Sequence, residues 1–138
     1  MSGSGQPSTA VFVYGTLLPG HLRWHLVDPF VARSHPARVA GRLYDTGRRY
    51  PAARFAPHDG EPQDAPMGVV HGALLRLRPE RAEAALDVLD LVEGDEYARI
   101  EIEAVHETPP GTTRCWTYEW IAGRARLVAL PEGRWTGD

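Results

Sequence analysis

The chain has 138 residues and a formal net charge of −3, and all fifteen of its basic residues are arginines. This length fits one compact domain, and the absence of a basic stripe argues against a nucleic-acid partner. Without lysine the chain can form neither a Schiff base nor a lysine-type phosphate loop, and its single cysteine, Cys115, excludes an intramolecular disulfide and a cysteine-rich zinc site.

The chain begins with a polar segment that is followed by an apolar one. Residues 1–9 are rich in Ser, Gly and Pro, lack a signal-peptide pattern, and are expected to form a disordered tail. Residues 10–14 are β-branched, aromatic or otherwise apolar and predict a buried strand that ends at Gly15. Residues 22–27 allow one or two helical turns, which we expect to stop near Asp28 and Pro29.

Further strands are expected in the middle of the chain. Residues 37–45 predict a strand in which Gly41 indicates a bulge or a close backbone approach. Residues 47–55 contain a shorter strand, and residues 58–66 carry acids, prolines and a glycine that are typical of a surface loop. Residues 68–77 alternate in character and predict another strand.

The clearest helix begins at Pro79, because proline suits the first helical turn and apolar residues follow at helical spacing. We expect it to end within residues 91–94. Residues 97–106 alternate as a half-buried strand, and the turn at 108–112 makes residues 114–121 its hairpin partner.

These elements predict an α+β fold with a mostly antiparallel sheet. The predicted organisation is one domain over residues 10–130, with a short ordered segment at 126–130 and a loose tail over 131–138. No apolar run approaches the ~20 residues of a membrane helix, so we expect no membrane association and a cytoplasmic location. Cys115 is expected to be a buried structural thiol.

The first cluster that could carry chemistry follows the opening strand. Tyr14, Gly15, Thr16 and Leu17 stand where a glycine lets the backbone turn and presents N–H groups to an anion or a carbonyl. An ordinary strand-to-loop turn would look the same. A dinucleotide-binding loop and a Walker loop are excluded, because their glycine spacing and lysine are missing.

The second cluster is acidic and lies between the helix and the next strand. Asp90, Glu93, Asp95 and Glu96 place four carboxylates within seven residues, which commonly means a solvated loop. Glu93, however, stands between Val92 and a glycine at the end of the core helix. The negative end of the helix dipole and partial burial would both raise its pKa toward the range useful for proton transfer.

Together the two clusters resemble the γ-glutamylcyclotransferase-like superfamily, and within it the γ-glutamylamine cyclotransferase or AIG2-like branch. The resemblance covers roughly residues 10–121. Its motifs, in chain order, are Tyr14-Gly15-Thr16-Leu17, Gly41-Arg42-Leu43-Tyr44, Tyr50-Pro51-Ala52, Val70-His71-Gly72, Leu89-Asp90 with Glu93, Tyr97 with Arg99, and Tyr118.

The resemblance implies a small mixed, mostly antiparallel β-barrel with flanking helices. It implies that Glu93 is the catalytic residue and that the substrate-binding residues are Tyr14, Gly15, Thr16, Leu17, Tyr97 and Tyr118. No metal and no cofactor are implied. Thr and Leu after Tyr-Gly, in place of Ser with Asn or Leu, favour γ-glutamyl amines over glutathione as substrates.

The implied reaction is an amide-cleaving cyclisation, catalysed by an acyltransferase or lyase. The α-amine of a γ-glutamyl group attacks its own γ-amide and releases 5-oxoproline and a free amine, with Glu93 as general base and acid. Three alternatives remain open: a tailoring enzyme that removes a γ-glutamyl protecting group from a natural product, a non-catalytic small-molecule-binding module of the same fold, and an interaction domain. Arg99 is expected to orient Glu93 or Glu96 or to pair on the surface, and the sequence predicts no oligomeric state.

Overall fold

The computed structural model describes residues 9–55, 68–123 and 125–136. The loop expected at 58–66 and most of the expected tail over 1–9 lie outside the described residues. Thr9 is described, and its carbonyl accepts a hydrogen bond from the Leu77 N–H at 2.8 Å.

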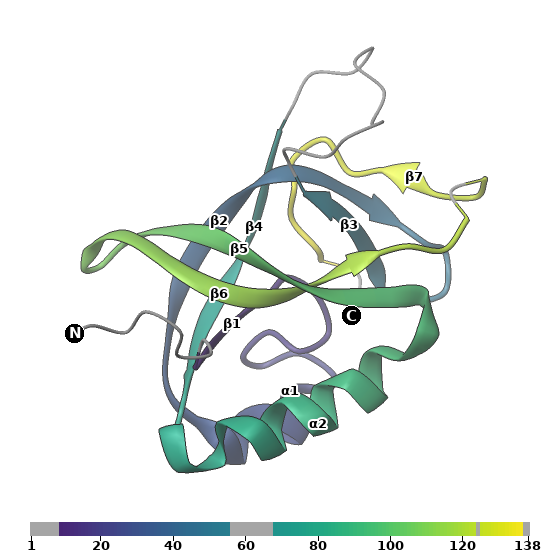
Figure 1. Cartoon of the computed structure of the whole chain (residues 1–138). Helices are drawn as coiled ribbons and strands as arrows, with labels where there is room; N and C mark the ends of the chain where they lie inside the picture. Colours follow the sequence, from purple (N-terminus) through teal and green to yellow (C-terminus); the bar gives the residue numbers. More distant parts are fainter. Residues whose placement is uncertain (1–8, 56–67, 124, 137–138) are drawn as a thin grey trace.

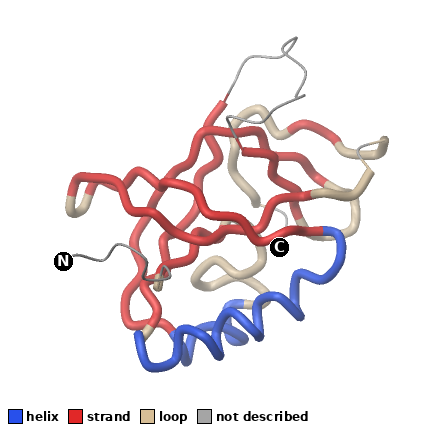
Figure 2. The backbone as a smooth tube through the Cα atoms, in the orientation of Figure 1, coloured by secondary structure: helices blue, strands red, loops and turns tan. Residues whose placement is uncertain are grey.

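Strands dominate the described chain, and the helices lie together on one side of them (Figures 1 and 2). The strands are β1 (Ala10–Val13), β2 (Val31–Asp45), β3 (Pro51–Phe55), β4 (Gly68–Leu77), β5 (Tyr97–Glu107), β6 (Pro110–Trp120) and β7 (Val128–Ala129). The α-helices are α1 (Trp24–Val27) and α2 (Ala82–Glu93), and the 3-10 turns are Asp28–Phe30, Pro79–Arg81 and Gly94–Glu96.

The strands close into a ring. Their order is β3-β2-β4-β1-β6-β5, and a further pairing of Arg38 in β2 with Val105 in β5 joins the ends of the sheet. The pairing of β1 with β6 is parallel, whereas the other pairings are antiparallel. The predicted α+β class and mostly antiparallel barrel with flanking helices are therefore confirmed.

β1 is buried on both faces, which explains why its sequence is apolar throughout rather than alternating. Ala10 and Phe12 belong to the core inside the barrel. Val11 and Val13 belong to a second core, where the barrel wall meets α1 and α2. The residue after Val13 therefore stands at a boundary between two cores, and the loop that follows is held from both sides.

α2 covers the barrel through one face. Its buried residues Ala82, Ala85, Leu86 and Leu89 follow the helical period that the sequence predicts. α1 lies beside α2 under the barrel (Figure 1). This packing fixes the last turn of α2, and with it Glu93, against the wall of the barrel.

Several element bounds differ from the prediction, and three of the differences have a clear physical reason. β2 begins at Val31 rather than at 37, because residues 31–36 pair with the end of β4 across an irregularity between Val31 and Arg33. The turn after α1 continues to Phe30, because Pro29 fits the start of a 3-10 turn. β6 begins at Pro110 rather than at 114, because it pairs with β5 as far as Glu107.

The chain end from 131 to 136 is packed, where the sequence predicted a loose tail. Trp135 is buried and joins the core inside the barrel. The Gly133 carbonyl accepts a hydrogen bond from the His71 N–H at 2.8 Å. A Cβ on Gly133 would lie 1.8 Å from the Val69 carbonyl oxygen, so only glycine allows this approach to β4.

Two buried features of the barrel agree with the prediction. Gly41 approaches β3 closely, since a Cβ there would lie 2.6 Å from the Arg54 carbonyl oxygen. Cys115 is fully buried, and burial raises the pKa of its thiol to about 12. None of the described helices is long and apolar enough to cross a bilayer.

Candidate active site

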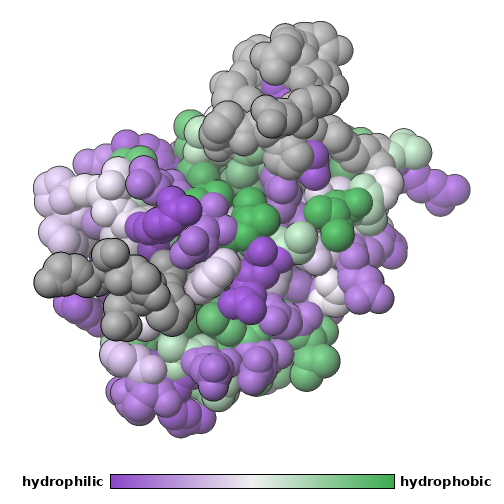
Figure 3. Space-filling model, viewed as in Figure 1, coloured by the Kyte–Doolittle hydropathy of each residue, from purple (hydrophilic) through white to green (hydrophobic). Residues whose placement is uncertain are grey.

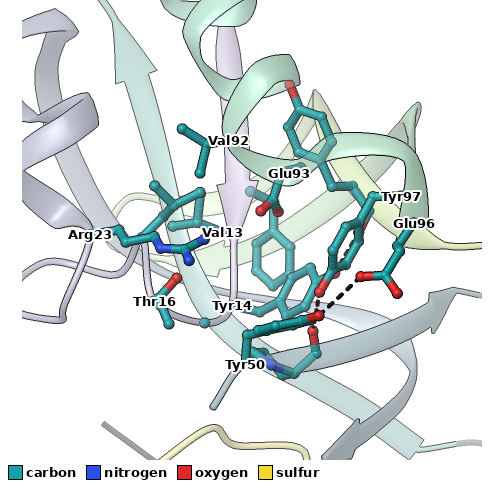
Figure 4. Close-up of a pocket in the computed structure, with 14 residues that line it drawn as sticks. Val13, Tyr14, Thr16, Arg23, Tyr50, Val92, Glu93, Glu96 and Tyr97 are labelled. Carbon is teal, nitrogen blue, oxygen red and sulfur yellow. Dashed lines mark hydrogen bonds between the residues drawn. The ribbon is translucent and has the colours of Figure 1, made fainter. Parts of the chain in front are cut away.

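A cavity of about 220 Å³ lies where the end of β1, the start of β3 and the end of α2 meet (Figure 4). The structure brings all seven sequence-predicted site residues to this cavity, although they come from four separate segments of the chain. They are Tyr14, Gly15, Thr16, Leu17, Glu93, Tyr97 and Tyr118. Their roles in binding or catalysis stay predictions.

The loop after β1 forms one wall of the cavity. Gly15 presses against Pro51, so that a Cβ on Gly15 would lie 2.6 Å from the Pro51 Cγ. The Gly15 carbonyl accepts from the Leu18 N–H at 3.0 Å, and the Thr16 carbonyl accepts from the Arg23 N–H at 2.7 Å. Within the described part of the chain, the N–H groups of residues 15, 16 and 17 have no acceptor. Because these residues line the cavity, their N–H groups are candidates for binding a ligand there.

Glu93 is the last residue of α2, which ends at Gly94 with a φ of 73°. Its side chain borders the cavity, while protein encloses its carboxyl on most other sides. Burial raises the pKa of Glu93 to about 7, and the positive charge of Arg23 acts weakly against this rise. At neutral pH such a carboxyl is present in both forms, so it can accept a proton and return it.

Three of the tyrosines that line the cavity each donate their hydroxyl proton to a fixed acceptor. Tyr14 donates to the Tyr118 carbonyl, Tyr97 donates to the Pro51 carbonyl at 2.6 Å, and Tyr118 donates to Asp90 Oδ1 at 2.6 Å. Burial raises the pKa of all three phenols, so they stay neutral. Their oxygens can therefore only accept hydrogen bonds from a ligand.

Glu96 lies at the rim and differs from Glu93 in its environment. Arg48 pairs with it at 2.7 Å and Tyr50 donates to it at 2.9 Å. The hydrogen bond from Arg48 lowers the pKa of Glu96. The two carboxyls therefore differ in protonation at neutral pH. Glu96 is ionised and paired with Arg48, whereas Glu93 has a pKa of about 7.

Arg99 does not contact either glutamate. It pairs with Asp90 at 3.1 Å and stacks over the Trp116 ring at 4.6 Å. The expectation that it orients Glu93 or Glu96 is therefore wrong, and the alternative of an ion pair holds. Because Asp90 also accepts from Tyr118, this pair supports a cavity wall from behind.

Seven lining residues were not among the predicted site residues. Three are apolar, and four carry polar groups or belong to the start of β3; they are Phe12, Val13, Val92, Arg23, Tyr50, Pro51 and Glu96. Tyr50 and Pro51 belong to a motif that contributed to the family resemblance but implied no role in binding or catalysis. Arg23 carries no sequence signal, because only the fold of the loop brings it to Thr16. Among the described residues, no group of three His, Cys, Asp or Glu side chains is arranged to hold a metal ion.

Comparison with known proteins gives a family and a fold. The family described as "Gamma-glutamyl cyclotransferase, AIG2-like" has a model that matches residues 11–137. Three similar solved structures come from different organisms: YkqA from Bacillus subtilis, an AIG2-like protein from Mus musculus, and a γ-glutamyl cyclotransferase specific to glutathione from yeast. No curated protein matches the chain.

The structural similarity extends over most of the chain. YkqA aligns with a TM-score of 0.67 at 20% identity over 92% of this chain, which spans only 39% of YkqA. The mouse protein aligns at 0.57 and 17% identity over 87% of this chain and 82% of its own. The yeast protein aligns at 0.57 and 15% identity over 87% of this chain and 72% of its own. At these identities the likeness shows the fold.

Proposed function

The chain belongs to the γ-glutamyl cyclotransferase, AIG2-like family, and from that membership we propose that it is an enzyme that cyclises a γ-glutamyl amine to 5-oxoproline and releases the amine. The observation that carries the proposal is Glu93, a carboxyl with a pKa of about 7 that borders a small cavity. The loop of N–H donors lines the same cavity.

The reaction places its nucleophile inside the substrate. Ionised Glu93 takes a proton from the α-ammonium, and the freed amine attacks the γ-carbonyl carbon. A new C–N bond closes the five-membered ring while the carbonyl oxygen becomes an oxyanion. Protonated Glu93 then gives its proton to the leaving nitrogen, and the old amide C–N bond breaks as the oxyanion returns to a carbonyl. The ring nitrogen, which is cationic after the attack, loses its second proton to ionised Glu93, and the released amine takes up that proton as an ammonium. Well-oriented intramolecular reactions reach effective molarities on the order of 10⁵–10⁸ M, so folding the substrate supplies much of the acceleration.

Two kinds of group that line the cavity would bind different parts of the substrate. The N–H groups of residues 15–17 would stabilise negative charge on the substrate, and one well-placed oxyanion donor is worth about 2.7–4 kcal/mol. The phenol oxygens of Tyr14, Tyr97 and Tyr118 would accept from the N–H groups of the ammonium and of the amide. A cytoplasmic location and the γ-glutamylamine class of substrate are part of the same proposal.

The test is an assay of 5-oxoproline release from a panel of γ-glutamyl amines, γ-glutamyl amino acids and glutathione. We expect wild-type turnover on the amines, and we expect Glu93→Gln to lower kcat by about 10²–10⁴-fold, because an amide cannot carry the proton. Asp95→Asn is the matched control, since Asp95 is an exposed acid two residues away that does not line the cavity.

Equal release by wild type and Glu93→Gln would overturn the mechanism. Absence of release from every substrate, together with binding of 5-oxoproline, would indicate a non-catalytic binding module. Release only from a larger amine-bearing natural product would indicate a tailoring enzyme with the same chemistry.

A further inference from the structure

Arg23 lines the cavity and is held there by its backbone. Its N–H donates to the Thr16 carbonyl at 2.7 Å, and its own carbonyl accepts from the Leu26 N–H at 2.9 Å. These two hydrogen bonds connect the backbone of Arg23 to the loop after β1 and to the start of α1. Figure 4 shows its guanidinium facing the cavity on the side of Thr16.

The guanidinium has no anionic partner in the part of the chain that the structure describes. The other arginines near the site are engaged: Arg48 pairs with Glu96 and Arg99 pairs with Asp90. Glu93 is near enough for the charge of Arg23 to act on its pKa, yet no ion pair joins the two. A half-buried arginine without a partner favours an anionic ligand, because its lost hydration is otherwise not replaced.

The substrate chemistry decides which anion fits. In a γ-glutamyl group the α-amine and the α-carboxylate are bonded to the same carbon. If Glu93 takes the proton of the α-amine, the α-carboxylate must lie beside Glu93. We infer that Arg23 binds the α-carboxylate of the γ-glutamyl group and so determines specificity for it, an inference that rests on the proposed cyclotransferase function.

This assignment leaves one role for the N–H groups of the loop after β1. With the carboxylate on Arg23, the N–H groups of residues 15–17 remain for the γ-carbonyl oxygen, where negative charge develops. Tyr50 and Glu96 lie on the other side of Glu93 from Arg23 (Figure 4). The leaving amine, which is bonded to the γ-carbonyl carbon, would then depart toward that rim.

The test compares binding of 5-oxoproline with that of its carboxamide, 5-oxoprolinamide, which lacks the negative charge. Titration calorimetry would use wild type, Arg23→Gln, Arg23→Lys and the control Arg38→Gln, which removes an arginine from a surface pair with Glu107. We expect wild type and the control to prefer the acid by about 10- to 100-fold, as a charge-assisted hydrogen bond allows. Arg23→Gln should abolish this preference, and Arg23→Lys should keep part of it.

The outcomes separate the two proposals. A carboxylate preference that survives in folded Arg23→Gln overturns the role of Arg23, even if 5-oxoproline is released normally. A preference that disappears in Arg23→Gln supports the role of Arg23, even if wild type releases no 5-oxoproline and the cyclotransferase proposal fails. Binding of neither compound by folded wild type overturns the assignment. In the turnover assay, Arg23→Gln should raise KM more than it lowers kcat.

Discussion

The burial that raises the pKa of Glu93 also lowers the free energy of unfolding of the protein once the pH is high enough to ionise this group in the unfolded chain. Its pKa is about 7 in the folded protein, against an ordinary value of 4.5. Below both values the carboxyl is protonated in the folded and the unfolded chain alike. Between them the unfolded chain has released the proton and the folded protein has kept it, so the free energy of unfolding falls as pH rises through this window.

Glu93→Gln should therefore stabilise the protein selectively at higher pH. Relative to wild type, we expect the variant to gain about 1–3 kcal/mol in free energy of unfolding between pH 4 and pH 8, because its amide never ionises. Urea unfolding at both pH values would measure the difference. Asp95→Asn should show no such gain, and an equal effect of Glu93→Gln at both pH values would contradict the raised pKa.

Gly15 packs directly against Pro51, so it connects the loop after β1 with the start of β3 beside the cavity. A Cβ there would lie 2.6 Å from the Pro51 Cγ and 2.7 Å from the Pro51 Cδ. The Pro51 carbonyl in turn holds the Tyr97 hydroxyl. A displacement of Pro51 would therefore reach both the loop after β1 and the Tyr97 hydroxyl.

Gly15→Ala should reduce turnover without unfolding the protein. We expect kcat/KM to fall by about 10²-fold, because a displacement of about 1 Å in a catalytic geometry has effects of this size. Circular dichroism would confirm the fold, and the 5-oxoproline assay would give the rate. Gly123→Ala is the matched control, since a Cβ on Gly123 meets nothing within 4 Å; unchanged kcat/KM in Gly15→Ala would refute the coupling.

The sequence predicts elements well where periodicity is local. β4 and α2 match because alternation over 68–77 and helical spacing after Pro79 depend only on their own residues. The start of β2 was missed because residues 31–36 contain an arginine, other polar residues and a proline, and its pairing with the distant β4 decides its structure. Within the site, Glu93 could be identified from its place at the end of a core helix. Arg23 could not be, because its position depends on a loop hydrogen bond to Thr16.

The molecule as a whole is a closed ring of strands with helices on one side and a chain end that returns to the barrel. On the face seen in Figure 3, hydrophilic and hydrophobic residues are interspersed. The returning end brings Trp135 into the same core as Phe12 and Leu74. Its indole N–H has no hydrogen-bond partner among the described residues, so its contribution to stability comes from apolar packing.

Trp135→Ala should therefore destabilise the whole barrel. We expect a loss of about 3–5 kcal/mol in free energy of unfolding, as for other large-to-small substitutions of a buried tryptophan. Urea unfolding followed by circular dichroism would measure it. Trp135→Phe should lose much less, because it keeps an aromatic ring and removes an unpaired donor. A small effect of Trp135→Ala would mean that the chain end contributes little to the core.

Cys115 gives the barrel an intrinsic chemical reporter. Its thiol is buried in the interior and, with a pKa of about 12, stays protonated at neutral pH, so maleimides and disulfide reagents should react with it only when the strands separate. The rate of its alkylation would then count opening events in the unmodified protein. A fluorophore could also be attached through a cysteine introduced at Leu91, which is 84% exposed, while the native thiol is left in place.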